Sequence, residues 1–109
     1  SVTTWGYSSG GALAALAPAD ALLLTFPDFG ALAHLPEELR AGYEIPADLS
    51  ELSPHTFVQT ATEDEIAARV SVPGAAARDY VSTHRVSTPA VARQRVRDAA
   101  AFLAEELEK

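Results

Sequence analysis

The segment Trp5-Gly6-Tyr7-Ser8-Ser9-Gly10-Gly11 restricts the possible folds of this chain more than any other. β-Branched residues precede it at positions 2–4, and a run of helix-forming residues follows it at positions 11–17. Glycines two residues before and two residues after a serine allow the close backbone approach of a sharp turn between a strand and a helix. The segment therefore predicts a strand, a strained turn at Ser8 flanked by Gly6 and Gly10, and a helix.

Strands and helices alternate along the rest of the chain. We expect strands at residues 21–26, 56–60 and 79–83, where the residues are apolar or rich in β-branched and aromatic types. Helices are expected at residues 36–40, at residues 62–70 after a capping box, and from Thr88 onward with Pro89 at the first helical position. The last helix carries an apolar stripe of Ala92, Val96, Ala99, Leu103 and Leu107.

This order of elements predicts a single α/β domain over residues 1–109. Its core is expected to be a mainly parallel sheet of about four strands with flanking helices. Residues 1–27 contribute a strand, a helix and a strand, and residues 55–109 contribute a strand, a helix, a strand and a helix. Residues 28–54 are rich in proline and are predicted to form an irregular, cap-like excursion. Trp5 and Tyr43 are expected in the core or in the lining of a pocket.

Composition excludes several classes of function. The net charge of −7 disfavours nucleic acid and anionic membrane surfaces as partners. The purely apolar runs are too short for a membrane span. The chain has no cysteine, which rules out disulfides and Cys-based zinc sites, and its histidines and acids lack a metal-binding spacing. We therefore expect no nucleic acid, no membrane, no metal and no cofactor, and the compartment stays open.

A serine nucleophile needs a base, and the base needs a carboxylate that orients it. Of the three histidines, His84 lies at the predicted carboxyl end of the last strand, where α/β sheets gather functional groups. His34 and His55 are expected at the surface. Asp64 follows the preceding strand, so the candidate residues occur in the chain order Ser8, Asp64 and His84. That order is the one expected for a serine on this kind of turn.

A structural interpretation of each candidate stays open. The hydroxyl of Ser8 can instead cap the first turn of the helix, Asp64 can cap the helix predicted at residues 62–70, and His84 can be a structural hydrogen-bonding residue. If Ser8 is the nucleophile, the N–H of Ser9 is expected to point toward the oxyanion that forms on a substrate carbonyl.

Five segments together resemble the α/β-hydrolase family of serine esterases, lipases and related peptidases. Residues 6–15 resemble its nucleophile turn and helix, and residues 19–27 are similar to the next strand. Residues 53–66 resemble the strand and loop that deliver the acid, which matches Asp64, and residues 83–85 resemble the histidine loop. Residues 102–107 are similar to the final helix. The resemblance spans essentially the whole chain but only the C-terminal half of the family's fold.

The resemblance implies a serine hydrolase that cleaves a small carboxylic ester or thioester through an acyl-enzyme. Ser8, Asp64 and His84 would be catalytic, and the Ser9 N–H would bind the oxyanion. The alternative is a non-catalytic, hydrolase-like interaction or binding domain, because a half-sheet leaves its first strand at an exposed edge. In that case we expect a homo-oligomer or docking on a partner chain. A module that binds an anion or cofactor at the start of the first helix is a third interpretation.

Overall fold

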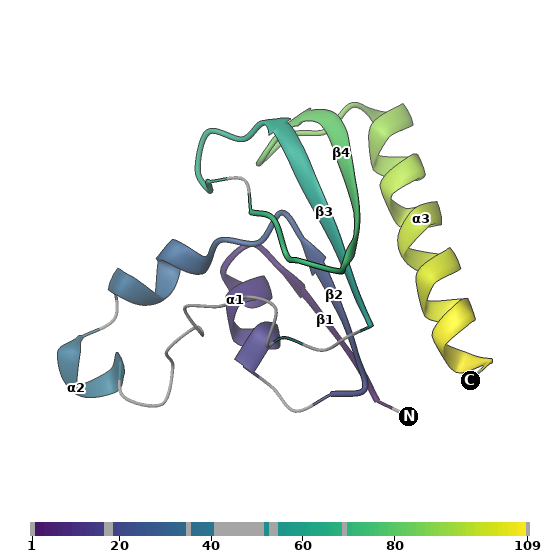
Figure 1. The fold of residues 1–109 in the computed structure, drawn as a ribbon. Coiled ribbons are helices and arrows are strands. Elements are labelled where there is room, and N and C mark those ends of the chain that lie inside the picture. The colour runs from purple at the N-terminus through teal and green to yellow at the C-terminus, as the bar shows by residue number, and fades with distance from the viewer. Residues whose placement is uncertain are drawn as a thin grey trace.

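The computed structural model of this protein describes residues 2–16, 19–34, 36–40, 52, 55–68 and 70–108. The elements follow in the order β1 (Thr3–Tyr7), α1 (Ser9–Leu16), β2 (Ala21–Thr25), the 3-10 helix η1 (Phe29–His34), α2 (Glu37–Arg40), β3 (Thr56–Glu63), β4 (Ala76–Thr83) and α3 (Pro89–Leu107) (Figure 1). The four strands form one parallel sheet in the order β1-β2-β3-β4. The predicted α/β class, with a parallel sheet of four strands and flanking helices, is confirmed.

The leucines of β2 place two helices on opposite faces of the sheet. Leu22 and Leu24 point to one face, where they pack in a cluster with Ala14 of α1. Leu23 points to the other face and packs in a cluster with Ala99 of α3. Figure 1 shows α1 and α3 on either side of the strands. β2 is buried along its whole length, as the continuous apolar run at residues 21–26 predicts.

The start of α3 is confirmed. The Thr88 side chain accepts a hydrogen bond from the N–H of Val91, and Pro89 occupies the first turn.

The predicted apolar face of α3 is wrong in part. Val96 and Leu107 are 56% and 79% exposed, while Ala99 is fully buried. The helix is turned so that Asp98 accepts a hydrogen bond from the Tyr80 hydroxyl at 2.6 Å. This contact with β4 fixes the rotation of the helix, and it carries part of the stripe away from the sheet.

The helix predicted at residues 62–70 is absent from the described part of that segment, residues 62–68 and 70. Thr62 and Glu63 continue β3 instead, because Glu63 pairs with Thr83 of β4. Asp64 Oδ1 accepts from the N–H groups of Ile66 and Ala67, as a helix cap would, but the turn goes no further. Extended pairing with β4 therefore overrides the local capping signal.

The excursion at residues 28–54 begins with the two short helices η1 and α2. Residues 35, 41–51, 53 and 54, which include Tyr43 and about half of the predicted cap, lie outside the described residues. Trp5 is half exposed on β1, at 50%, so it does not lie in the core, and a place in the lining of a pocket stays a prediction. Of the helices described, the longest is α3 with 19 residues, and none has the length and apolar character needed to span a bilayer.

Candidate active site

Ser8 is the one residue between β1 and α1, and its φ of 57° lies in the left-handed region. That conformation costs an L-residue other than glycine about 1–2 kcal/mol. Backbone hydrogen bonds hold the turn. The Ser8 N–H donates to the carbonyl of Thr25 at 3.0 Å, and the Ser8 carbonyl accepts from the N–H groups of Gly11 and Asp28, both at 2.9 Å. The end of β2 and the segment after it therefore keep Ser8 in its strained conformation.

The glycines around Ser8 differ in what they contribute. A Cβ atom on Gly6 would lie 2.1 Å from the carbonyl oxygen of Gly10, so only glycine fits there. A Cβ on Gly11 would lie 3.0 Å from Cβ of Pro27, which is a tight contact. A Cβ on Gly10 would meet no atom within 4 Å. Close backbone approach was expected at both flanking glycines. The structure requires the absence of a side chain at Gly6 and leaves room for one at Gly10.

A register shift between β3 and β4 places the acid and the base side by side at the end of the sheet. Ala61 pairs with Tyr80, and the last pair is Glu63 with Thr83. Between these two pairs β4 therefore contains one residue more than β3. The extra residue shifts the register of everything that follows. As a result, Asp64, the first residue after β3, lies level with His84, the first residue after β4.

A continuous chain of hydrogen bonds joins the three residues singled out in the sequence. Ser8 Oγ lies 2.8 Å from His84 Nε2, and His84 Nδ1 lies 2.9 Å from Asp64 Oδ2. An ionised carboxylate only accepts hydrogen bonds, so Nδ1 carries the proton of the neutral imidazole and Nε2 accepts from the Ser8 hydroxyl. The side chains of His84 and Asp64 are only 4% and 6% exposed, so water competes little for these contacts.

The charge of Asp64 is stabilised by its hydrogen bonds. Burial alone would raise the pKa of its carboxyl. The bonds that it accepts from the Ala67 N–H, from His84 and from the Ile66 N–H outweigh burial, and the pKa is lowered from its ordinary value of 3.8. Asp64 is therefore ionised at neutral pH, and its charge fixes the tautomer of His84.

A polar network crosses the sheet on the side covered by α3. Trp5 Nε1 donates to the Thr25 hydroxyl, which donates to Gln59 Oε1 at 2.6 Å. Gln59 Nε2 in turn donates to the Tyr80 hydroxyl at 3.0 Å, and Tyr80 donates to Asp98. The network links all four strands to α3. No sequence pattern indicated it, because a single glutamine in a strand is ordinarily solvent-facing.

The network also perturbs the ionisation of Tyr80. Burial, together with the hydrogen bond donated to Asp98, raises the pKa of Tyr80 to about 12. Since β3 leads to Asp64 and β4 leads to His84, this network fixes the relative position of the strands that carry the acid and the base.

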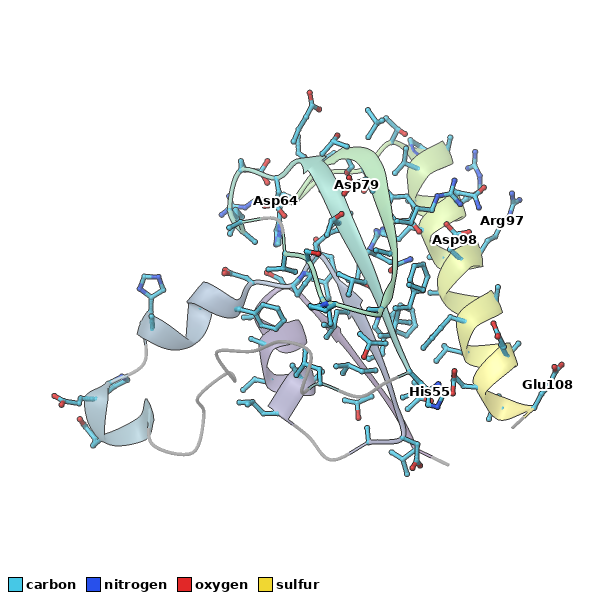
Figure 2. The ribbon with its side chains drawn as sticks, viewed as in Figure 1. His55, Asp64, Asp79, Arg97, Asp98 and Glu108 are labelled. Carbon is cyan, nitrogen blue, oxygen red and sulfur yellow. The ribbon has the colours of Figure 1, made fainter. Side chains whose placement is uncertain are left out.

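The two other histidines are exposed, as predicted, and take no part in this arrangement. His34 ends η1, and His55 precedes β3. Figure 2 shows His55 at the opposite end of β3 from Asp64. Within the described ranges, no group of three or more His, Asp or Glu side chains is placed to hold a metal ion.

The Ser9 N–H opens α1, where the first N–H groups of a helix have no partner inside it. It can therefore donate to a group bound beside Ser8. Two hollows of about 300 and 330 Å³ flank β4, and neither is lined by Ser8, Asp64 or His84. About half of the segment at residues 28–54, which is expected to form a cap, falls outside the described residues.

No family model matches the chain, and no curated protein or solved structure matches it either.

Proposed function

We propose that this protein is a serine hydrolase that cleaves a small carboxylic ester or thioester through an acyl-enzyme on Ser8. The observation that carries the proposal is the hydrogen-bonded chain from Ser8 through both ring nitrogens of His84 to Asp64. A serine at positive φ on a strand-to-helix turn is the geometry in which such nucleophiles recur. The resemblance to α/β-hydrolase esterases and lipases, over the C-terminal half of their fold, supports the same assignment.

Each residue then has a definite role. Ser8 Oγ attacks the carbonyl carbon of the substrate as its proton passes to His84 Nε2, and the carbonyl oxygen becomes an oxyanion beside the Ser9 N–H. Collapse of this adduct expels the alcohol or thiol, which takes the proton from Nε2 and leaves the acyl group on Ser8. Water then repeats the sequence, again with His84 as base and then acid, and releases the carboxylic acid. Asp64 stabilises the positive charge that His84 holds transiently.

The test is hydrolysis of short-chain p-nitrophenyl esters and of the matching acyl thioesters. We expect turnover by the wild-type protein, with an initial burst of p-nitrophenol equal to the amount of enzyme if deacylation is slow. Ser8→Ala should lose turnover, and Ser9→Ala should keep it because the Ser9 backbone N–H remains. Turnover that persists in Ser8→Ala would refute the assignment.

A second candidate, a non-catalytic interaction or binding domain, is favoured by a separate observation. β1 lies at the edge of the sheet, and its residues carry no charge. Trp5 and Tyr7 on this strand are 50% and 45% exposed. An uncharged edge strand with exposed aromatic side chains is suited to pairing with another strand, which would form a homo-oligomer or a complex with a partner chain.

Light scattering on the wild type and on Trp5→Lys examines this candidate, because a lysine on an edge strand opposes pairing. The second candidate predicts an oligomer or complex that dissociates in the variant, together with a Ser8 that does not react with esters. A monomeric protein that hydrolyses esters would argue against it.

A further inference from the structure

His84 forms four hydrogen bonds, and its partners are two pairs of adjacent residues, Tyr7 with Ser8 and Asp64 with Glu65. Its imidazole contacts Ser8 at 2.8 Å and Asp64 at 2.9 Å. Its carbonyl accepts from the Tyr7 hydroxyl at 2.6 Å, and its N–H donates to Glu65 Oε1 at 2.8 Å. The neighbour of each side-chain partner thus holds the peptide groups of the same histidine.

These two backbone contacts take the place of the hydrogen bonds that a neighbouring strand would supply. β4 ends at Thr83, so the N–H and carbonyl of His84 have no place in the strand ladder. His84 is 4% exposed, and buried backbone groups need partners. Tyr7, the last residue of β1, and Glu65, in the loop after β3, supply them.

Ring packing restricts the same residue. The ring of Tyr7 lies 5.6 Å from the imidazole of His84, and the ring of Phe26 lies 6.0 Å from each of them. Phe26 itself has a φ of 46°, so two residues in this small region are held in the left-handed conformation. The position of the imidazole therefore depends on contacts outside the chain of Ser8, His84 and Asp64.

We propose that Tyr7 and Glu65 are positioning residues, which hold the backbone of His84 so that its imidazole stays between Ser8 and Asp64. As a role in catalysis this rests on the proposed function, because the imidazole must receive a proton from Ser8 Oγ. A displacement of about 1 Å in such a group can lower a rate by about 100-fold. Neither residue touches substrate in this role.

Four variants test the proposal. Tyr7→Phe removes the hydroxyl and keeps the ring, and Glu65→Ala removes the acceptor. Glu65→Gln keeps a carbonyl oxygen at the same place and is the conservative rescue. Glu63→Ala is the matched control, because Glu63 is an exposed acid two residues away and is not among the hydrogen-bond partners of His84, which are Tyr7, Ser8, Asp64 and Glu65.

The kinetic readout is the reaction of Ser8 with a fluorophosphonate, measured over a range of probe concentrations. Tyr7→Phe and Glu65→Ala should lower the rate at saturating probe by about 10-fold or more, with the half-saturating concentration unchanged. Glu65→Gln should recover most of that rate, and Glu63→Ala should match the wild type. Equal rates in Tyr7→Phe, Glu65→Ala and the wild type would overturn the proposal.

A second readout separates this proposal from the proposed function. The Nδ1–H proton of His84, held by buried Asp64, should give a downfield proton NMR signal that is absent in His84→Gln. Tyr7→Phe and Glu65→Ala should shift or broaden it, whereas Glu65→Gln and Glu63→Ala should preserve it. A wild-type protein that fails to react with the probe refutes the proposed function alone. An unchanged signal in both Tyr7→Phe and Glu65→Ala refutes the positioning role, whether or not the wild type reacts.

Discussion

Gly6→Ala is the substitution with the sharpest structural consequence. The new Cβ would lie 2.1 Å from the carbonyl oxygen of Gly10, 2.5 Å from its carbonyl carbon and 2.7 Å from Cα of Gly11. All three are backbone atoms in the first turn of α1, so the clash cannot be relieved by rotating a side chain. Cβ atoms essentially never approach another heavy atom closer than 3.0 Å, and the start of the helix must therefore move by roughly 1 Å.

Overpacking of this kind costs about 1–3 kcal/mol, and we expect the upper end because the obstacle is backbone. For a domain of this size, 3 kcal/mol lowers the melting temperature by roughly 13 °C. Circular dichroism at 222 nm during heating measures the change.

Gly10→Ala is the matched control for this experiment. Its Cβ would meet no atom within 4 Å, and alanine is favoured over glycine inside a helix by up to about 1 kcal/mol. Gly10→Ala should therefore melt at or above the wild-type temperature. If both variants melt together, or if Gly6→Ala is as stable as the wild type, the geometry of the turn is wrong.

Three further predictions concern groups in unusual surroundings. Because Ser8 has a φ of 57°, Ser8→Gly should be more stable than Ser8→Ala by about 1 kcal/mol in urea unfolding, and the reverse order would contradict the strained turn. The pKa of Tyr80 is raised to about 12 from 10.0. The stability that this shift contributes to the folded state is therefore fully present below pH 10.0 and is lost as the pH rises toward 12. The loss is on the order of 3 kcal/mol, and urea midpoints at alkaline pH should show it in the wild type and not in Tyr80→Phe. The pKa values of Asp64 and Asp98 are lowered from 3.8, so the stability that they contribute is present above that pH and is lost as the pH falls through their folded-state pKa values. Asp98→Asn should make unfolding less sensitive to acid, and an unchanged acid limb would count against the hydrogen bonds assigned to Asp98.

The sequence predicts the parts of this fold that depend on neighbouring residues. The Ser8 turn follows from a strand, closely spaced glycines and a helix-forming run, and the start of α3 follows from Thr88 and Pro89. The approach of Asp64 to His84 was also predictable in outline, because the carboxyl ends of adjacent parallel strands lie at the same edge of a sheet.

The remaining features depend on partners distant in the sequence. Pairing between β3 and β4 overrides the capping signal after Thr62, and the register shift that brings Asp64 level with His84 has no sequence signature. The rotation of α3 is set by the contact between Tyr80 and Asp98, which a helical stripe does not contain. The contacts of Tyr7 and Glu65 with the His84 backbone likewise exist only once the strands are assembled.

In the proposed mechanism, His84 activates Ser8 as a nucleophile. Treatment of the intact protein with a fluorophosphonate, followed by mass spectrometry of the protein and of its peptides, tests it most directly. We expect one added phosphonyl group, located on Ser8, and its absence in His84→Ala. No label on the wild type, or a label on Ser8 that persists in His84→Ala, would contradict the claim.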